Sequence, residues 1–355
     1  MAEILIDRVT KRFGTFTAVK DLEIRFADGE VACLLGPSGC GKTTLMRMIA
    51  GLETPTSGRI LFGNRDVTAL STSRRNVGMV FQYPVMYPTL SVEENIALPM
   101  RQDRGISAAE RDRRVAEMLD VLDMRDQRGR FIDELDAGNR QKVAVGRAVA
   151  RGSDIVLFDE PTTNVEVNAK LQLIRAIKTV IQRTRQTIVY VTHDQTEAMT
   201  LADRIALMDS GDISQYDRPD QLYSRPMTEF GGWFLGNPGM NFVPATVANG
   251  TLAAAVLAEP IRLAQAVPPG VPIKLGIRPE WLDMYGEPRP GTVAGVLSDQ
   301  TIGIAGRYLT KVSFGGVDVK IKTAGRPPAA LGQTVHVKPQ IDRILLYAGG
   351  NRITG

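Results

Sequence analysis

The stretch that decides the fold of this chain reads Gly36-Pro37-Ser38-Gly39-Cys40-Gly41-Lys42-Thr43. It matches the phosphate-loop pattern G-x-x-x-x-G-K-[ST] in full, between an apolar run at 31–35 and a helix-competent run at 44–50. Its glycines let successive backbone N–H groups turn inward around a triphosphate, where the N-terminus of the following helix adds partial positive charge. Lys42 can reach the β- and γ-phosphates, and the Thr43 hydroxyl can ligate Mg²⁺. The pattern therefore predicts a nucleoside triphosphate site made by residues 36–43 together with Thr44.

Composition narrows the class of protein. The chain has 355 residues, 43% of them apolar, which is enough for two domains with cores of their own. The 43 basic and 39 acidic residues nearly balance, so the formal net charge of +4 does not indicate nucleic acid binding, although it suits a protein that works near an anionic membrane surface. The only two cysteines, Cys33 and Cys40, indicate neither a disulfide nor a metal site, and favour a reducing compartment. Because no long apolar run or signal-peptide core is present, we expect a protein that is either cytosolic or held at a membrane only by partners.

The first 235 residues alternate apolar strand-like runs with amphipathic helices, which is typical of a three-layer α/β domain. The runs at 155–158 and 187–192 are predicted to be buried parallel strands. Helix signals replace strand signals between about 85 and 150. The capping box Ser107-Ala108-Ala109-Glu110 marks the start of one predicted helix there. We therefore predict a helical subdomain inserted in the α/β core.

Residues 236–355 have a different texture. A breaker-rich hinge at 231–239 is followed by short alternating segments such as 271–277 and 312–321, punctuated by Gly and Pro. This pattern predicts a small all-β domain, either an antiparallel barrel or a sandwich.

Polar residues follow three of the apolar strands. Asp159 ends one strand and suits a hold on Mg²⁺, while the next residue, Glu160, can polarise the attacking water as a general base. His193 ends a second strand, where side chains face the ligand crevice, and is predicted to sense the γ-phosphate. Gln82 follows a third strand and could complete the Mg²⁺ shell. The plainer interpretations are a solvated strand end, a structural histidine and an ordinary loop glutamine.

In order and spacing, these elements resemble the ATPase subunits of ABC transporters over residues 1–235, and 236–355 resembles the C-terminal barrel of carbohydrate, polyol and glycerol-phosphate importers. The resemblance implies a P-loop, RecA-like domain followed by an OB-like regulatory domain, with ATP and Mg²⁺ as cofactors. It implies that Phe13 stacks on adenine, that Lys42, Glu160 and His193 are catalytic, and that Thr43, Gln82 and Asp159 hold the metal. It also implies two membrane-spanning permease subunits, one coupling helix docking near Gln82–Leu90, and indirectly a solute-binding protein. The expected location is the cytoplasmic side of the bacterial inner membrane.

The signature segment departs from the family pattern Leu-Ser-Gly-Gly-Gln. Here it reads Leu135-Asp136-Ala137-Gly138-Asn139, and in the family it contacts in trans the nucleotide held by the opposite subunit. Asp136 places an anion near the γ-phosphate where the family serine donates a hydroxyl, which should cost free energy on the order of kcal/mol. Glu166 also stands where the family has Asp. We therefore expect an asymmetric heterodimer with a second, non-identical ATPase subunit, the alternative being a homodimer that turns over slowly.

Three functions remain in view. The first is the energy-coupling ATPase of an importer for a sugar, polyol or glycerol-type solute. The second is a mainly regulatory nucleotide-binding subunit with little hydrolysis of its own, which the unusual signature favours. The third is an ABC-type ATPase that acts on DNA or ribosomes. Such proteins tend to carry long coiled coils or tandem ATPase domains, and this sequence shows neither. The transported solute cannot be read from this chain.

Overall fold

Strand β3 (Val31–Leu35) lies inside the main sheet of the protein, and all five of its residues are buried. The computed structural model describes residues 3–101, 103, 105–263, 267–268, 270–303 and 306–353. The chain divides into two units, Met1–Pro219 and Asp220–Gly355. The boundary predicted from the sequence, at 235/236, lies after two short helices that the structure groups with the second unit. The functional boundary at 235/236 stays a prediction.

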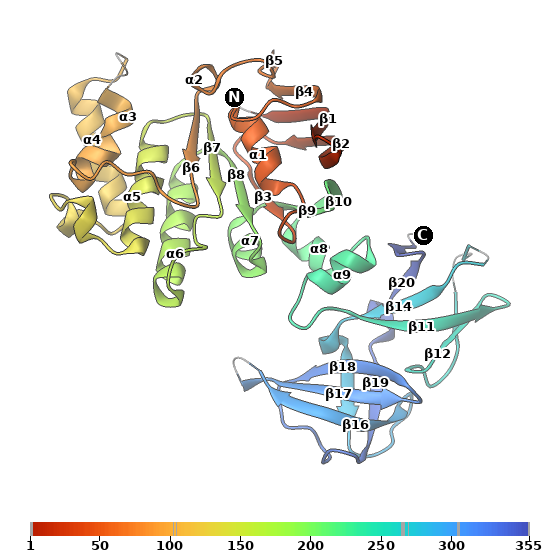
Figure 1. Cartoon of the computed structure of the whole chain (residues 1–355). Helices are drawn as coiled ribbons and strands as arrows, with labels where there is room; N and C mark the ends of the chain where they lie inside the picture. Colours follow the sequence, from red (N-terminus) through yellow and green to blue (C-terminus); the bar gives the residue numbers. More distant parts are fainter. Residues whose placement is uncertain are drawn as a thin grey trace. The chain divides into compact units, whose positions relative to one another are not determined.

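The main sheet of the first unit has six strands in the order β10-β9-β3-β8-β7-β6 (Figure 1). All neighbouring pairs are parallel except β10 with β9. Parallel sheets covered on both faces need continuous apolar strands, and the runs at 155–158 and 187–192 supply them, as predicted. The remaining strands of this sheet are β6 (Val77–Val80), β7 (Ile155–Asp159), β8 (Thr187–Thr192), β9 (Arg204–Asp209) and β10 (Asp212–Asp217).

A second, antiparallel sheet of the same unit has the order β2-β1-β4-β5. One hydrophobic core joins its inner face, helix α1 and the main sheet, and includes Ile6, Phe26, Leu45 and Val189. The phosphate loop therefore sits between two sheets that share a core. The strands are β1 (Ile4–Phe13), β2 (Phe16–Phe26), β4 (Ser57–Phe62) and β5 (Arg65–Asp66).

Helices occupy the region predicted to be a helical insertion. Figure 1 shows α3, α4 and α5 gathered beside the β6 edge of the main sheet. Ser107 caps α4 by accepting a hydrogen bond from the Glu110 N–H, so the predicted cap is present. The helices of this unit are α1 (Lys42–Ala50), α2 (Thr72–Arg75), α3 (Val92–Arg101), α4 (Ala108–Val121), η1 (Arg125–Gln127), η2 (Ile132–Glu134), α5 (Ala137–Ala150), α6 (Val167–Arg183) and α7 (Gln195–Leu201).

The second unit is built on antiparallel strands, as its sequence texture predicts. Its two sheets have the orders β13-β12-β11-β14-β20-β21 and β15-β19-β16-β17-β18. The alternating segment at 312–321 lies in a hairpin, because Gly315 and Gly316 both have positive φ and turn the chain between β17 and β18. The strands are β11 (Asn241–Ala248), β12 (Thr251–Ala254), β13 (Ile261–Arg262), β14 (Ile273–Ile277), β15 (Leu282–Tyr285), β16 (Val293–Ile302), β17 (Tyr308–Phe314), β18 (Val317–Thr323), β19 (Thr334–Pro339), β20 (Leu345–Ala348) and β21 (Asn351–Arg352). The helices are α8 (Pro219–Ser224), α9 (Glu229–Phe234), η3 (Pro279–Trp281) and η5 (Ile341–Arg343).

Arg278 ties the short helices of this unit to its sheets. Its side chain is fully buried and donates to the carbonyl oxygens of Tyr223, Gly232 and Leu235. Burial lowers the pKa of this guanidinium, with which the Tyr223 ring stacks at 4.1 Å. A buried cation satisfied by helix carbonyls holds α8 and α9 in place. Together the two units confirm the predicted class, an α/β P-loop domain followed by an all-β domain.

Candidate functional site

The phosphate loop connects β3 to α1, and close backbone approach explains two of its glycines. A Cβ at Gly36 would lie 2.3 Å from the Met208 carbonyl oxygen, and one at Gly41 would lie 2.4 Å from that of Ala18. Gly41 also has a φ of +103°, which strains any other residue. The loop is therefore held against β9 and β2 in a shape that larger residues cannot adopt. Its backbone leads directly into the N-terminus of α1, where anions bind favourably.

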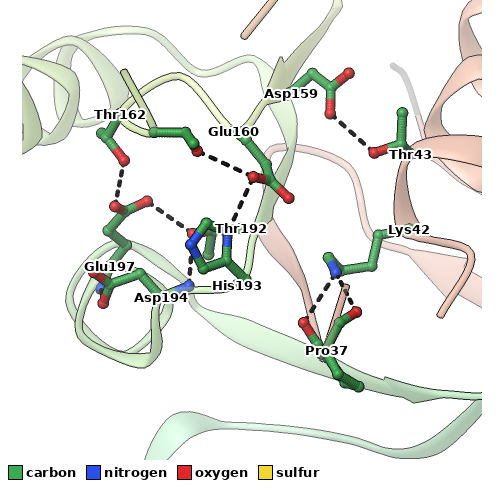
Figure 2. Close-up of polar contacts among 12 residues, drawn as sticks. Pro37, Lys42, Thr43, Asp159, Glu160, Thr162, Thr192, His193, Asp194 and Glu197 are labelled. Atoms are coloured by element: carbon green, nitrogen blue, oxygen red, sulfur yellow. Dashed lines mark hydrogen bonds and ion pairs between the residues drawn. The ribbon is translucent and has the colours of Figure 1, made fainter. Parts of the chain in front are cut away.

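Lys42 is buried and turned back on its own loop. Its ammonium donates to the Gly36 carbonyl at 2.9 Å and to the Pro37 carbonyl at 2.8 Å (Figure 2). Only 4% of the residue is exposed. Weak neutral acceptors thus hold a full positive charge at the mouth of the loop, and a phosphate oxygen would be a stronger partner.

The candidate metal ligands lie next to each other. The hydroxyl of Thr43, in the first turn of α1, donates at 3.3 Å to Oδ1 of Asp159, which ends β7 (Figure 2). Burial raises the pKa of Asp159, because the ionised carboxylate loses its water. A cation beside it would favour the charged form, so these two oxygens fit a Mg²⁺ ion whose other ligands would be water and phosphate. Within the described residues the Gln82 side chain makes no hydrogen bond to Thr43 or Asp159, and its place in the Mg²⁺ shell stays a prediction.

Glu160 and His193 meet at the carboxyl ends of the neighbouring strands β7 and β8. His193 Nδ1 lies 3.0 Å from Glu160 Oε2, which also accepts a hydrogen bond from the Thr163 hydroxyl at 3.0 Å (Figure 2). Both contacts use Oε2, and among the described residues Oε1 makes no hydrogen bond. Glu160 has a φ of +44°, and its N–H donates to the Val191 carbonyl at 3.0 Å. A strained backbone held by a neighbouring strand is common at functional positions, where it aims the side chain.

A buried carboxylate behind His193 escaped the sequence reasoning. Glu197, on α7, is fully buried and accepts hydrogen bonds from the hydroxyls of Thr162, Tyr190 and Thr192. The oxygen that accepts from Thr162, Oε1, also pairs with the Lys170 ammonium at 2.7 Å, while Oε2 accepts from Tyr190 and Thr192. This network ties the segments carrying Glu160 and His193 to α6. The hydroxyls at the strand end and an acidic residue four positions after a histidine are the only sequence signals, and neither points to a pair with Lys170.

Phe13, the predicted adenine platform, ends β1 with 47% of its surface exposed. An exposed aromatic ring on a strand end is free to stack on a planar base.

The unusual signature segment begins a helix. Asp136 is the N-cap of α5, and its two carboxylate oxygens accept from the Asn139 N–H and side-chain amide, both at 2.7 Å. Aspartate is among the best N-caps because its charge meets the positive helix end. Gly138 is packed, since a Cβ there would lie 3.1 Å from the Ala169 Cβ. Asp136 therefore has a local structural role that the sequence reasoning did not consider, and it remains exposed at the tip of the helix.

Segment 82–90 carries a group of exposed apolar side chains. Tyr83 and Val85 are 70% and 63% exposed. The buried Asn95 holds this segment by accepting from the Tyr87 N–H and donating to the carbonyls of Tyr87 and Leu90. Apolar side chains fixed on a supported loop are typical of an interaction surface. In the described part of the chain, no helix is long and apolar enough to span a bilayer.

Comparisons with known proteins identify both units. A family model described as ABC transporter matches residues 19–163, and one described as MalK OB fold domain matches residues 236–282. The sn-glycerol-3-phosphate import ATP-binding protein UgpC of Ruegeria pomeroyi is 38% identical over 349 residues, covering 98% of this chain and 97% of that protein. The xylose/arabinose import ATP-binding protein XacJ of Haloferax volcanii is 39% identical over 286 residues, covering 80% and 75%.

Solved structures agree with the fold of the first unit. The dimeric structure of MJ0796, a bacterial ABC transporter cassette, has a TM-score of 0.54 and 28% identity, covering 61% of this chain and 98% of that one. A post-hydrolysis structure of the same cassette bound to ADP and Pi has a TM-score of 0.53 and 27% identity, over the same shares of the two chains.

Proposed function

This chain belongs to the ATP-binding subunits of ABC transporters and hydrolyses ATP, and we propose that the hydrolysis drives import of a carbohydrate, polyol or glycerol phosphate. The family resemblance read from the motifs is thereby confirmed. Relatives named for glycerol-3-phosphate and for xylose and arabinose support the solute class. The observation that carries the proposed mechanism is the Glu160–His193 pair at 3.0 Å, on strand ends that neighbour the phosphate loop.

Binding begins with an exchange of partners at Lys42. Its ammonium leaves the Gly36 and Pro37 carbonyls for the β- and γ-phosphates, a stronger charge-assisted contact, while the loop N–H groups and the α1 N-terminus hold the remaining phosphate oxygens. Phe13 stacks on adenine. Thr43 and Asp159 would hold Mg²⁺, with Gln82 as the third predicted ligand. The bound metal supplies positive charge that offsets the charge developing on the phosphates.

Hydrolysis uses the two strand-end residues. Oε1 of Glu160 accepts a hydrogen bond from the attacking water and takes its proton, while Oε2 stays bonded to Thr163 and His193. The water oxygen bonds to the γ-phosphorus as the bond from that phosphorus to the β–γ bridging oxygen breaks, so that inorganic phosphate forms and ADP leaves. The imidazole of His193 bridges Glu160 and the γ-phosphate, so it holds the base and the phosphate in register. The positive charge of Lys42 stabilises the negative charge that develops on the oxygens of the β- and γ-phosphates as ADP leaves.

The site is completed by a second subunit. The MJ0796 cassette was solved as a dimer, which supports a pairing in which segment 135–139 of one chain contacts the nucleotide of the other. Asp136 in this chain puts a carboxylate in that contact, where the Asn139 side-chain amide donates to it at 2.7 Å. We therefore favour pairing with a non-identical ATPase subunit, which gives one good site and one poor site. The same residue favours the second candidate function, a mainly regulatory subunit.

The partners follow from the family. Segment 82–90, with its exposed Tyr83 and Val85, receives a coupling helix from one of two membrane-spanning permease subunits. A solute-binding protein delivers the solute to the permeases. The chain then works at the cytoplasmic side of the bacterial inner membrane, held there by the permeases.

Glu160→Gln tests the proposed chemistry in the assembled transporter. The variant should bind ATP as the wild type does and lose hydrolysis, because the amide cannot take a proton from water. Thr163→Val serves as a matched control, since it removes a contact of Oε2 and leaves the base. Unchanged turnover in Glu160→Gln would overturn the role of Glu160. If the wild-type complex hydrolyses little or no bound ATP in a single-turnover experiment, the regulatory candidate would be favoured.

A further inference from the structure

Lys11 lies directly over the ring of Phe13. Its ammonium is 4.8 Å from the ring centroid, within the range of an energetically useful cation–π contact. Both residues are on β1, two positions apart, so they share one face of the strand. Only 13% of the Lys11 side chain is exposed, against 47% of Phe13. The cation is therefore sheltered while the ring is open to a partner.

Two further contacts fix the Lys11 ammonium. It pairs with Glu53 Oε2 at 2.8 Å and donates to the Thr54 carbonyl at 2.8 Å. An ammonium has three N–H donors, so two have oxygen partners and the third is left for the ring. Free surface lysines move among many rotamers, whereas this one is bound at three points.

The acceptors of Lys11, Glu53 and Thr54, lie in the segment just after helix α1. The N–H groups of Leu52 and Glu53 donate to the Arg47 carbonyl, which closes the last turn of α1. The following segment is bonded to β1, because the Thr56 N–H donates to the Thr10 carbonyl at 2.8 Å and the Thr56 hydroxyl accepts from the Arg12 N–H at 3.0 Å. Lys11 thus links the ring of Phe13 to the helix that begins with the phosphate loop.

We propose that Lys11 is a positioning residue for the nucleotide base, which holds one face of the Phe13 ring so that the other face stacks on adenine. A cation on one face draws the ring electrons toward itself and lowers the negative potential of the opposite face. That opposite face then repels the electron-rich adenine less, and the fixed ring loses less freedom on binding. The inference rests on the proposed stacking of adenine on Phe13.

The test compares ATP with tripolyphosphate, which has the phosphates and no base, as ligands of the full-length chain. Lys11→Met should weaken ATP binding about two- to fivefold, the range of exposed cation–π contacts, and leave tripolyphosphate binding unchanged. Lys11→Arg should bind ATP about as tightly as the wild type, since a guanidinium group also stacks on aromatic rings. Arg12→Met, which removes one charge on the opposite face of β1, is the matched control and should change neither ligand.

The Phe13→Ala background separates the role of Lys11 from the stacking of adenine on Phe13. There Lys11→Met should have no further effect on ATP. Equal weakening of ATP and tripolyphosphate by Lys11→Met would mean that the charge acts on the phosphates, and would overturn the inference. If Phe13→Ala weakens ATP while Lys11→Met does not, the inference fails and the adenine platform stands. If Phe13→Ala leaves ATP binding intact, the platform itself fails.

Discussion

Replacing Asp136 by serine should strengthen the proposed contact between segment 135–139 and the nucleotide of the partner subunit. The change removes the carboxylate that faces the partner's γ-phosphate in the proposed dimer and supplies a hydroxyl that can donate to it. The helix should not suffer, because serine caps helices about as well as aspartate. The Asn139 N–H, which now donates to Asp136 at 2.7 Å, keeps an acceptor in the serine side chain.

The size of the effect follows from the charge and its surroundings. Two unit charges 4 Å apart repel by about 4 kcal/mol at an effective dielectric of 20 and by about 1 kcal/mol in water. Asp136 is exposed in the single chain and both its oxygens are hydrogen-bonded by Asn139, so the lower part of that range applies. We expect about 1–2 kcal/mol for each contact, which is about a 5- to 30-fold gain in an equilibrium constant.

ATP-dependent dimerisation measures this gain directly. The parent is the Glu160→Gln chain, in which bound ATP should persist, and sedimentation with Mg²⁺ and ATP gives the dimer affinity. Asp136→Ser should tighten the dimer, and Asp136→Asn should recover most of the gain, since it removes the charge and keeps the cap. Asp133→Ser, which removes an exposed carboxylate just before the signature, should change little. Dimers of Asp136→Ser and Asp136→Asn no tighter than the parent would refute the repulsion.

Three further changes have defined outcomes. Asp159→Asn should raise the free energy of unfolding without nucleotide by about 1 kcal/mol, because burial raises the pKa of this carboxyl and its ionised form is costly. Because the folded wild type binds this proton more tightly than the unfolded chain does, its free energy of unfolding should fall as pH rises through the raised pKa of Asp159, and that of Asp159→Asn should not. Thermal melts with and without Mg²⁺-ATP should also show that the ligand stabilises the wild type and no longer stabilises the variant. Lys170→Met should lower the free energy of unfolding by about 2–4 kcal/mol in urea titrations, since it leaves the buried Glu197 without its cation, and adding Glu197→Gln should restore part of the loss. Gly41→Ala should abolish ATP binding in equilibrium dialysis, because its Cβ would lie 2.4 Å from the Ala18 carbonyl oxygen; retained binding would show that the loop can relax.

The parts of the site that lie next to each other in sequence were predictable. The strand, loop and helix around Lys42 form one local unit, and their residue types predict both the fold of that unit and the phosphate ligand. Asp159, Glu160 and His193 were found because each follows a continuous apolar strand. Parallel strands bring such ends to one edge of the sheet, which places Glu160 beside His193.

The parts that depend on distant pairing were not predictable. Lys11 meets Glu53, and Lys170 meets Glu197, only after the sheets and helices have packed. No periodicity connects residues that far apart, and a charged residue in a helix or strand is usually solvated. Asp136 is a different case, because the preference of helix N-termini for aspartate could have predicted its cap from the sequence.

The mass of the assembled transporter tests the central claim most directly. The complex would be purified through a tag on this chain after co-expression with its permeases and any neighbouring ATPase subunit, and weighed intact in its membrane-mimetic carrier. The account predicts one copy of this chain, one different ATPase subunit and two permease subunits. Two copies of this chain with no second ATPase subunit would contradict it.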